Sequence, residues 1–357
     1  MKDSPAELIS TVLSGSWRPE PEPLDVTADG LNRISRQLLA SGAAALAWRR
    51  ARISALKDSP ASQELRQAYK LQTLHSGLHE REILEVLSRL REDGVEPILV
   101  KGWAVARAYP EKGLRPYGDI DLIVRPKHLP AANTVLAHPR AEMYNADLDH
   151  KEFASMSEAR IEGLFDRSRL VPLGDSNVRV LAAEDHLVFL CLHALRHGAW
   201  RPLWLCDIAA ELEARPADFD WDLCLGGGRR QSDWVACAIG LAHRLVGANL
   251  DRTPLEARAT NLPGWLISSV LEQWENPYPM EHAPFNYRAP MATYLRHPAG
   301  LLRDLLARWP NKIEATISVG GPMNRLPRLP FQIGNGLLRI GRFAVGLRSG
   351  LGAGNEN

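Results

Sequence analysis

The pattern of apolar and polar positions changes twice along the chain. Over the first ninety residues apolar side chains recur every three or four positions, which predicts helices, the longest over residues 62–92. Asp93 and Gly94 should end that helix, because glycine adopts a left-handed C-cap without strain. From Pro97 the pattern shortens and alternates, and helical spacing returns from Ala183. Four runs in the middle segment predict strands: residues 98–100, 120–124, 141–150 and 177–181.

This order of elements predicts an α+β fold in which a mixed sheet is flanked by helical regions at both ends of the chain. The boundaries divide the chain into an N-terminal helical region over residues 1–92, an α/β core over 93–182, a C-terminal helical domain over 183–310 and a basic, glycine-rich tail over 311–357. The tail resembles a basic amphipathic helix, but packing on the protein's own core is favoured over membrane binding.

Composition limits the possible functions. The chain has 357 residues, 24% of them charged, and a net charge of +1, which gives no electrostatic basis for coating a nucleic acid. The four cysteines form no CxxC pair, and the first ten residues lack the apolar segment of a signal peptide. Apolar runs are too short to span a membrane. These features favour a cytoplasmic protein that acts on small molecules.

Candidate chemistry lies in the middle segment. Asp119 and Asp121 alternate with apolar residues on a predicted strand, so both carboxylates project from one face. Two carboxylates at such a short separation repel each other unless a cation lies between them. Carboxylate oxygens are donors that suit Mg²⁺ or Mn²⁺. The alternative is the solvated face of a half-buried strand. Three neighbouring features favour a metal beside a phosphate chain: Lys101-Gly102 at a helix start, Arg115, and Gly118.

These residues resemble the nucleotidyltransferase superfamily of the polymerase-β type, and more closely a family of uncharacterised bacterial nucleotidyltransferases. The likeness covers residues 82–213. One departure is Trp103, which follows Gly102 where the superfamily has serine or glycine, so that Lys101 takes over the phosphate contact. The matching segments are Lys101-Gly102, Arg115, Asp119-Ile120-Asp121, Asp147-Leu148-Asp149-His150, Glu184-Asp185-His186-Leu187, the run from Leu192 to His197, and the run from Trp204 to Ile208.

The resemblance implies a nucleotidyltransferase-type core that transfers a nucleoside monophosphate from a nucleoside triphosphate to an unidentified small molecule or protein. It implies that Asp119, Asp121 and a third carboxylate, Asp149 or else Asp147, hold Mg²⁺ or Mn²⁺ and carry catalysis. Two alternatives stay open: a catalytically silent binding module, and a toxin–antitoxin-type modifier of protein or tRNA. The implied nucleotide contacts are Lys101, Gly102, Arg115 and Gly118, and the implied acceptor-side contacts are His193, Arg196 and His197.

Two other motifs are weaker. His186, His193 and His197 share one helix face, but a zinc site needs further ligands, so packing or a hydrogen bond, with Asp207 as one partner, is favoured. The glycine-rich run 226–230 lacks the spacing of a phosphate-binding loop and is interpreted as a loop between helices.

Overall fold

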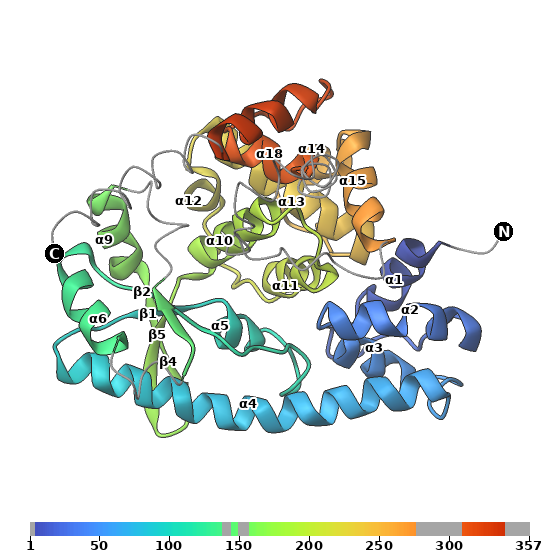
Figure 1. Ribbon diagram of the computed structural model, residues 1–357, viewed down its shortest axis with the longest axis horizontal. Coiled ribbons are helices and arrows are strands. Elements are labelled where there is room, and N and C mark those ends of the chain that lie inside the picture. Colours follow the sequence, from blue (N-terminus) through green and yellow to red (C-terminus); the bar gives the residue numbers. More distant parts are fainter. Residues whose placement is uncertain (1–3, 138–143, 149–156, 276–308, 340–357) are drawn as a thin grey trace, which may run out of the picture.

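A computed structural model describes residues 4–137, 144–148, 157–275 and 309–339. The protein is mixed α/β, with one five-stranded mixed sheet and many helices (Figure 1). The prediction of a mixed sheet flanked by helices is therefore confirmed at this level. No helix in the described segments is long and apolar enough to cross a lipid bilayer.

The sheet has the strand order β3-β2-β1-β5-β4. Strand β1 is antiparallel to β2 and parallel to β5, whereas β3 is parallel to β2, so the sheet is mixed. Strands β4 and β5 form an antiparallel hairpin, of which the sequence pattern predicted only the second strand. The bounds are β1 Ile98–Val100, β2 Ile120–Ile123, β3 Ala146–Leu148, β4 Arg169–Leu173 and β5 Ser176–Val180.

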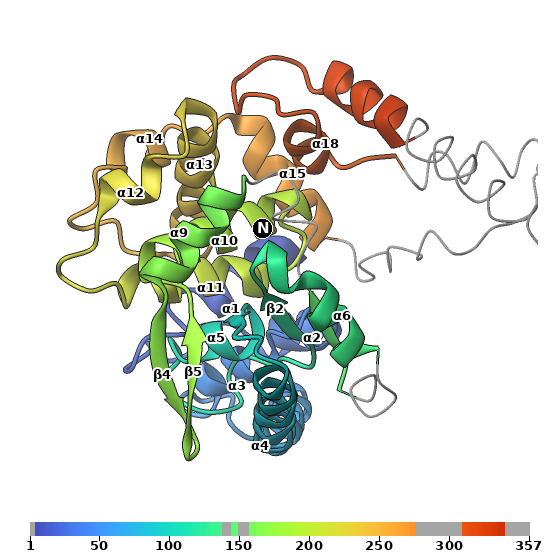
Figure 2. The ribbon, with the colours of Figure 1, turned by 90° about the vertical axis from the view of Figure 1, so that its left-hand side faces the viewer.

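One face of the sheet rests on the long helix α4, Pro60–Glu92, which runs along the lower edge of Figure 1 and is seen almost end-on in Figure 2. Ser59 caps its first turn, and Gly94 follows its end at φ +72°, as the sequence predicted. The apolar stripe predicted for this helix is only partly buried. Its C-terminal half packs on the sheet, whereas Leu71, Leu74 and Leu78 follow the helical spacing but are exposed.

The opposite face of the sheet packs against α9, Glu158–Arg167, and α10, Ala183–Arg196. Strand alternation explains the division: Ile98 and Val100 belong to the core shared with these helices, whereas Leu99 belongs to the core shared with α4. Ser157 caps α9 by accepting a hydrogen bond from the amide of Arg160.

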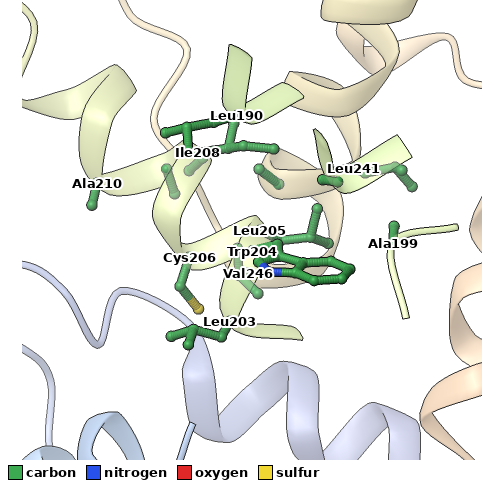
Figure 3. Packing of buried hydrophobic residues seen from close by; sticks show 14 of the residues in the cluster. Leu190, Ala199, Leu203, Trp204, Leu205, Cys206, Ile208, Ala210, Leu241 and Val246 are labelled. Atoms are coloured by element: carbon green, nitrogen blue, oxygen red, sulfur yellow. The ribbon is translucent and has the colours of Figure 1, made fainter. Parts of the chain in front are cut away.

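Helices from the N-terminal and C-terminal parts of the described chain pack together in one helical region. The N-terminal helices share one hydrophobic core with the helices that follow the sheet. Figure 3 shows part of this core, with Trp204 and Leu205 lying near Leu190, Leu241 and Val246. The N-terminal helices are α1 Pro5–Leu13, α2 Ala28–Ala40 and α3 Ala44–Ala51, and the later ones are α11 Pro202–Glu213, α12 Trp221–Leu225, α13 Arg229–Val246, α14 Glu256–Thr260, α15 Gly264–Trp274 and α18 Lys312–Ser318.

Two short elements connect this scaffold to the site. Helix α5, Gly102–Ala106, begins two residues after the end of β1, at the helix start predicted at Lys101-Gly102. Helix α6, Leu129–Leu136, follows a 3₁₀ turn at Pro126–His128 and packs beside β3. The described part of the tail folds back on α18, where Arg339 forms an ion pair with Glu314.

Candidate functional site

The predicted carboxylates lie where β2 begins. Asp121 is the second residue of β2 and is 7% exposed, whereas Asp119 just precedes the strand and is exposed. Pairing places Asp121 opposite Val100 of β1 and opposite Asp147 of β3. Partners directly across neighbouring strands point to the same face, and the strands lie about 4.8 Å apart. Asp121 and Asp147 are therefore neighbours on the face that packs against α9 and α10.

The structure describes one of the two candidates for the third carboxylate. Asp147 is exposed and stands in register with Asp121. Asp149 and His150 lie outside the described residues. Both acids belong to the same strand region of the sequence, so the role of either one stays a prediction.

Lys101 takes an unusual backbone conformation at the turn between β1 and α5. Its φ of 54° and ψ of −146° fall in a region that L residues rarely adopt. Gly102 follows at φ +29°, and a Cβ there would lie 3.4 Å from the carbonyl oxygen of Asp119. The turn thus presses against the backbone that leads into β2. Strain of this kind persists where the surrounding structure enforces it, and it concentrates at functional sites.

This turn positions the Lys101 amine beside the carboxylate of Asp121. Nζ of Lys101 lies 3.2 Å from Oδ1 of Asp121, and both side chains are largely buried. The same amine lies 5.6 Å from the ring centroid of Phe189 on α10. Lys101 therefore connects the sheet carboxylates to the helix that covers them.

Arg115 is held in a buried ion pair. Its guanidinium donates to both carboxylate oxygens of Asp207 on α11 at 3.1–3.3 Å, and Tyr109 donates to the same carboxylate at 2.7 Å. Burial, the largest single effect, favours the neutral guanidine, but the charge and hydrogen bonds of Asp207, together with the charges of Tyr109 and Asp119, outweigh it and raise the pKa of Arg115. Burial, followed by the charge of Asp207, raises the pKa of Tyr109 well above its usual value. Arg115 thus anchors the loop before β2 to α11, and its predicted nucleotide contact stays a prediction.

Arg201 is a residue that the sequence reasoning missed. It precedes α11, and its guanidinium lies 5.5 Å from the ring centroid of Trp200 and 5.9 Å from that of Trp204. Burial and the positive charge of Arg115 lower its pKa, while the charges of Asp207 and Asp119 act in the opposite direction. Its Nε is buried without a hydrogen-bond partner in the described structure. No motif in the sequence marks this arginine.

The predicted acceptor-side residues lie at the C-terminal end of α10. The rings of His193 and His197 are 4.6 Å apart, and both pack on Trp204 at 5.0 and 5.4 Å. His193 also stacks on Phe189, which contacts Lys101. Arg196 and His197 thus lie on the side of the sheet that carries the carboxylates. Gly118, a predicted nucleotide contact, is exposed immediately before Asp119.

Two weaker sequence interpretations can now be assessed. His186 pairs with Glu211 across α10 and α11 at 3.1 Å, and Asp207 pairs with Arg115 and Tyr109 instead of the proposed histidine. Within the described segments, no three His, Cys, Asp or Glu residues gather in a way that could hold a metal. Residues 226–228 do form a loop between α12 and α13, but Arg229 and Arg230 begin α13.

The donor atoms of three carboxylates near the start of β2 are of the type that the implied cation prefers, although in the described structure these three side chains do not gather into a group that could hold a metal ion. Asp119, Asp121 and Asp147 offer only carboxylate oxygens, the ligands that Mg²⁺ and Mn²⁺ prefer. Two of them come from the same strand segment, and the third is in register with Asp121. A ligand set of this kind suits a hard divalent ion and does not suit zinc.

Comparison with known proteins gives one match. A family model described as an uncharacterised nucleotidyltransferase matches residues 29–155 and 138–245, which together span more than half of the chain. None of the curated proteins and none of the solved structures matches the chain. The matched segments include the turn at Lys101, the carboxylates of β2 and both histidines of α10.

Proposed function

Because the chain belongs to this family of uncharacterised nucleotidyltransferases, we propose that it transfers a nucleoside monophosphate from a nucleoside triphosphate to a small-molecule or protein acceptor. The observation that carries the proposal is the strand register. It sets Asp147 beside Asp121 on the face that Asp119 shares by alternation. The family is in accord with transferase activity and a nucleoside triphosphate substrate.

In the proposed reaction an acceptor hydroxyl oxygen attacks the α-phosphorus of the nucleotide. A new P–O bond forms, the bond from that phosphorus to the bridging oxygen breaks, and pyrophosphate leaves with the electron pair. The hydroxyl proton passes to a carboxylate, for which Asp147 and Asp149 are the candidates. No covalent intermediate on the protein is required.

Cationic side chains of this chain would bind and orient the phosphates. Lys101 is one, because its amine already lies 3.2 Å from the carboxylate of Asp121. Arg201 is the second, because its half-buried guanidinium lies over the rings of Trp200 and Trp204 and its buried Nε–H has no partner in the described structure. Charge placed in advance near the reacting phosphate stabilises the charge that develops there. We assign Arg115 a positioning role, since Asp207 engages its guanidinium.

Asp119, Asp121 and a third carboxylate would hold Mg²⁺ or Mn²⁺. When bound, such an ion supplies Lewis-acid stabilisation of phosphate charge and lowers the pKa of a coordinated hydroxyl. The rest of the mechanism uses protein groups: Lys101 and Arg201 hold the phosphates.

The test measures pyrophosphate release from each nucleoside triphosphate with Mg²⁺ and a cell extract as the source of acceptor. The wild-type protein should release pyrophosphate, and the variant Asp119→Asn/Asp121→Asn should release it at least 100-fold more slowly. This loss corresponds to a rise of about 2.7 kcal/mol in the activation free energy. Asp175→Asn is the matched control, because Asp175 is exposed in the turn between β4 and β5. Unchanged release in the double variant would contradict the proposal. Nucleotide binding without release would favour the silent binding module.

A further inference from the structure

A cavity of about 570 Å³ lies on the helical side of the sheet, and one of its lining residues, Phe189, contacts Lys101. Its walls come from α9, α10, α12 and the loop before α13. A volume of this size is typical of small-molecule sites. Much of the wall is apolar, formed by Leu164, Val188, Phe189, Leu192 and Leu223.

Three arginines also line the cavity, against two aspartates. Arg167 is neutralised by Asp185, with which it makes two hydrogen bonds at 2.8 and 3.0 Å. Arg160 instead donates to the neutral amide oxygen of Gln231 at 2.9 Å. Arg196, on α10, is the third. The cavity therefore combines an apolar surface with guanidinium groups, one of which has a neutral partner.

The cavity adjoins the proposed reaction centre through a single side chain. Phe189 lines the cavity, and its ring centroid lies 5.6 Å from Nζ of Lys101. That amine lies 3.2 Å from Asp121. A molecule held in the cavity would thus end close to the carboxylates while its body rests on α9 and α10.

We propose that this cavity binds the acceptor, and that the acceptor is an amphipathic anion: an apolar body that bears a carboxylate or phosphate and a hydroxyl to be modified. This inference rests on the proposed function. In the proposed function the phosphates of the nucleotide are met by Lys101 and Arg201, neither of which lines the cavity, and a nucleobase carries no charge for Arg160 to bind. An anionic group on the acceptor satisfies that guanidinium through a charge-assisted hydrogen bond.

Binding is tested by calorimetry on the full chain without nucleotide. The probes are 4-hydroxyphenylacetate for a carboxylate, phenyl phosphate for a phosphate, and tyrosol as an uncharged counterpart. At least one charged probe should bind, with an affinity at least tenfold above that of tyrosol. The stronger of the two charged probes identifies the anionic group of the acceptor. Equal affinity for tyrosol, or no binding of either charged probe, would overturn the inference.

Two variants assign any binding to this cavity. Leu223→Trp should narrow the cavity and weaken binding, and Arg160→Gln should weaken binding at least fivefold, with Arg160→Lys recovering part of the loss. Arg36→Gln is the control, because Arg36 is an exposed arginine on α2. Circular dichroism checks that each variant is folded, and Arg160→Gln keeps the test decisive if Leu223→Trp does not fold. Binding that Arg160→Gln leaves unchanged would refute the assignment.

The acceptor role has a separate readout. A probe that binds should inhibit pyrophosphate release competitively with the extract and not with the nucleotide. Binding without inhibition would overturn the acceptor role. The variant Asp119→Asn/Asp121→Asn should still bind the probe, because neither aspartate lines the cavity. Failure of the proposed function would therefore appear as loss of the carboxylate effect on release, with probe binding intact.

Discussion

The strained turn at Lys101 can be measured directly by comparing two variants, Lys101→Gly and Lys101→Ala. Both remove the amine and its contact with Asp121, so that loss cancels in the comparison. They differ in backbone preference at φ 54° and ψ −146°. Alanine keeps the strain of this conformation, about 1–3 kcal/mol, and glycine does not.

Glycine also has a cost, because its greater conformational freedom stabilises the unfolded chain by about 0.4–1 kcal/mol relative to alanine. The net expectation is that Lys101→Gly unfolds with a free energy about 0.5–2 kcal/mol higher than Lys101→Ala. In an ordinary helix or strand the order would be the reverse. The sign alone therefore tests whether the turn is strained.

The assay is urea unfolding followed by circular dichroism, with equal slopes required before the midpoints are compared. Both variants should also lose most pyrophosphate release, because neither carries the amine. An alanine variant as stable as the glycine variant, or more stable, would refute the strained turn. Full activity in either variant would refute the role of the amine.

Three further predictions concern the scaffold. Asp207→Ala leaves the buried guanidinium of Arg115 without its counter-ion and should lower the free energy of unfolding by about 3–5 kcal/mol, whereas a loss below about 1 kcal/mol would contradict the buried pair. The pKa of Glu111 is lowered in the folded protein, mainly by hydrogen bonds from Arg52. The ionised Glu111 therefore stabilises the folded state above the ordinary pKa of a glutamate. This stabilisation is lost as the pH falls through the lower pKa of the folded state. The difference in melting temperature between the wild type and Glu111→Gln should therefore be largest near neutral pH and should shrink towards zero in acid. A difference that does not change with pH would contradict this prediction. Burial raises the pKa of all four cysteine thiols, so a thiol-reactive disulfide reagent should modify them only after unfolding, and rapid labelling of the native protein would count against this packing.

The local pattern of apolar and polar residues was sufficient to predict much of the fold. Strand β1 and helix α4 were predicted within two residues, since alternation and helical periodicity are properties of neighbouring residues. Strand β4 was missed because its five residues include Pro172 and three are exposed, which weakens the alternation. The exposed leucines of α4 show the same limit, because periodicity predicts a stripe and not what covers it.

The site was predictable only as far as it is local. Asp119 and Asp121 share a face by alternation, and that follows from the sequence. The pairing of Asp121 with Asp147 depends on strand register, which long-range packing sets. The ion pair of Arg115 with Asp207 joins residues 92 positions apart, and no local signal predicts it.

The central claim, that a nucleoside monophosphate is transferred, is tested most directly by following the label. Nucleoside triphosphates labelled at the α-phosphate or at the γ-phosphate are incubated with the protein, Mg²⁺ and extract. The α-label should enter an acceptor while the γ-label leaves in pyrophosphate, and Asp119→Asn/Asp121→Asn should abolish both. Entry of the γ-label into the acceptor, or α-label transfer that survives the double substitution, would contradict the account.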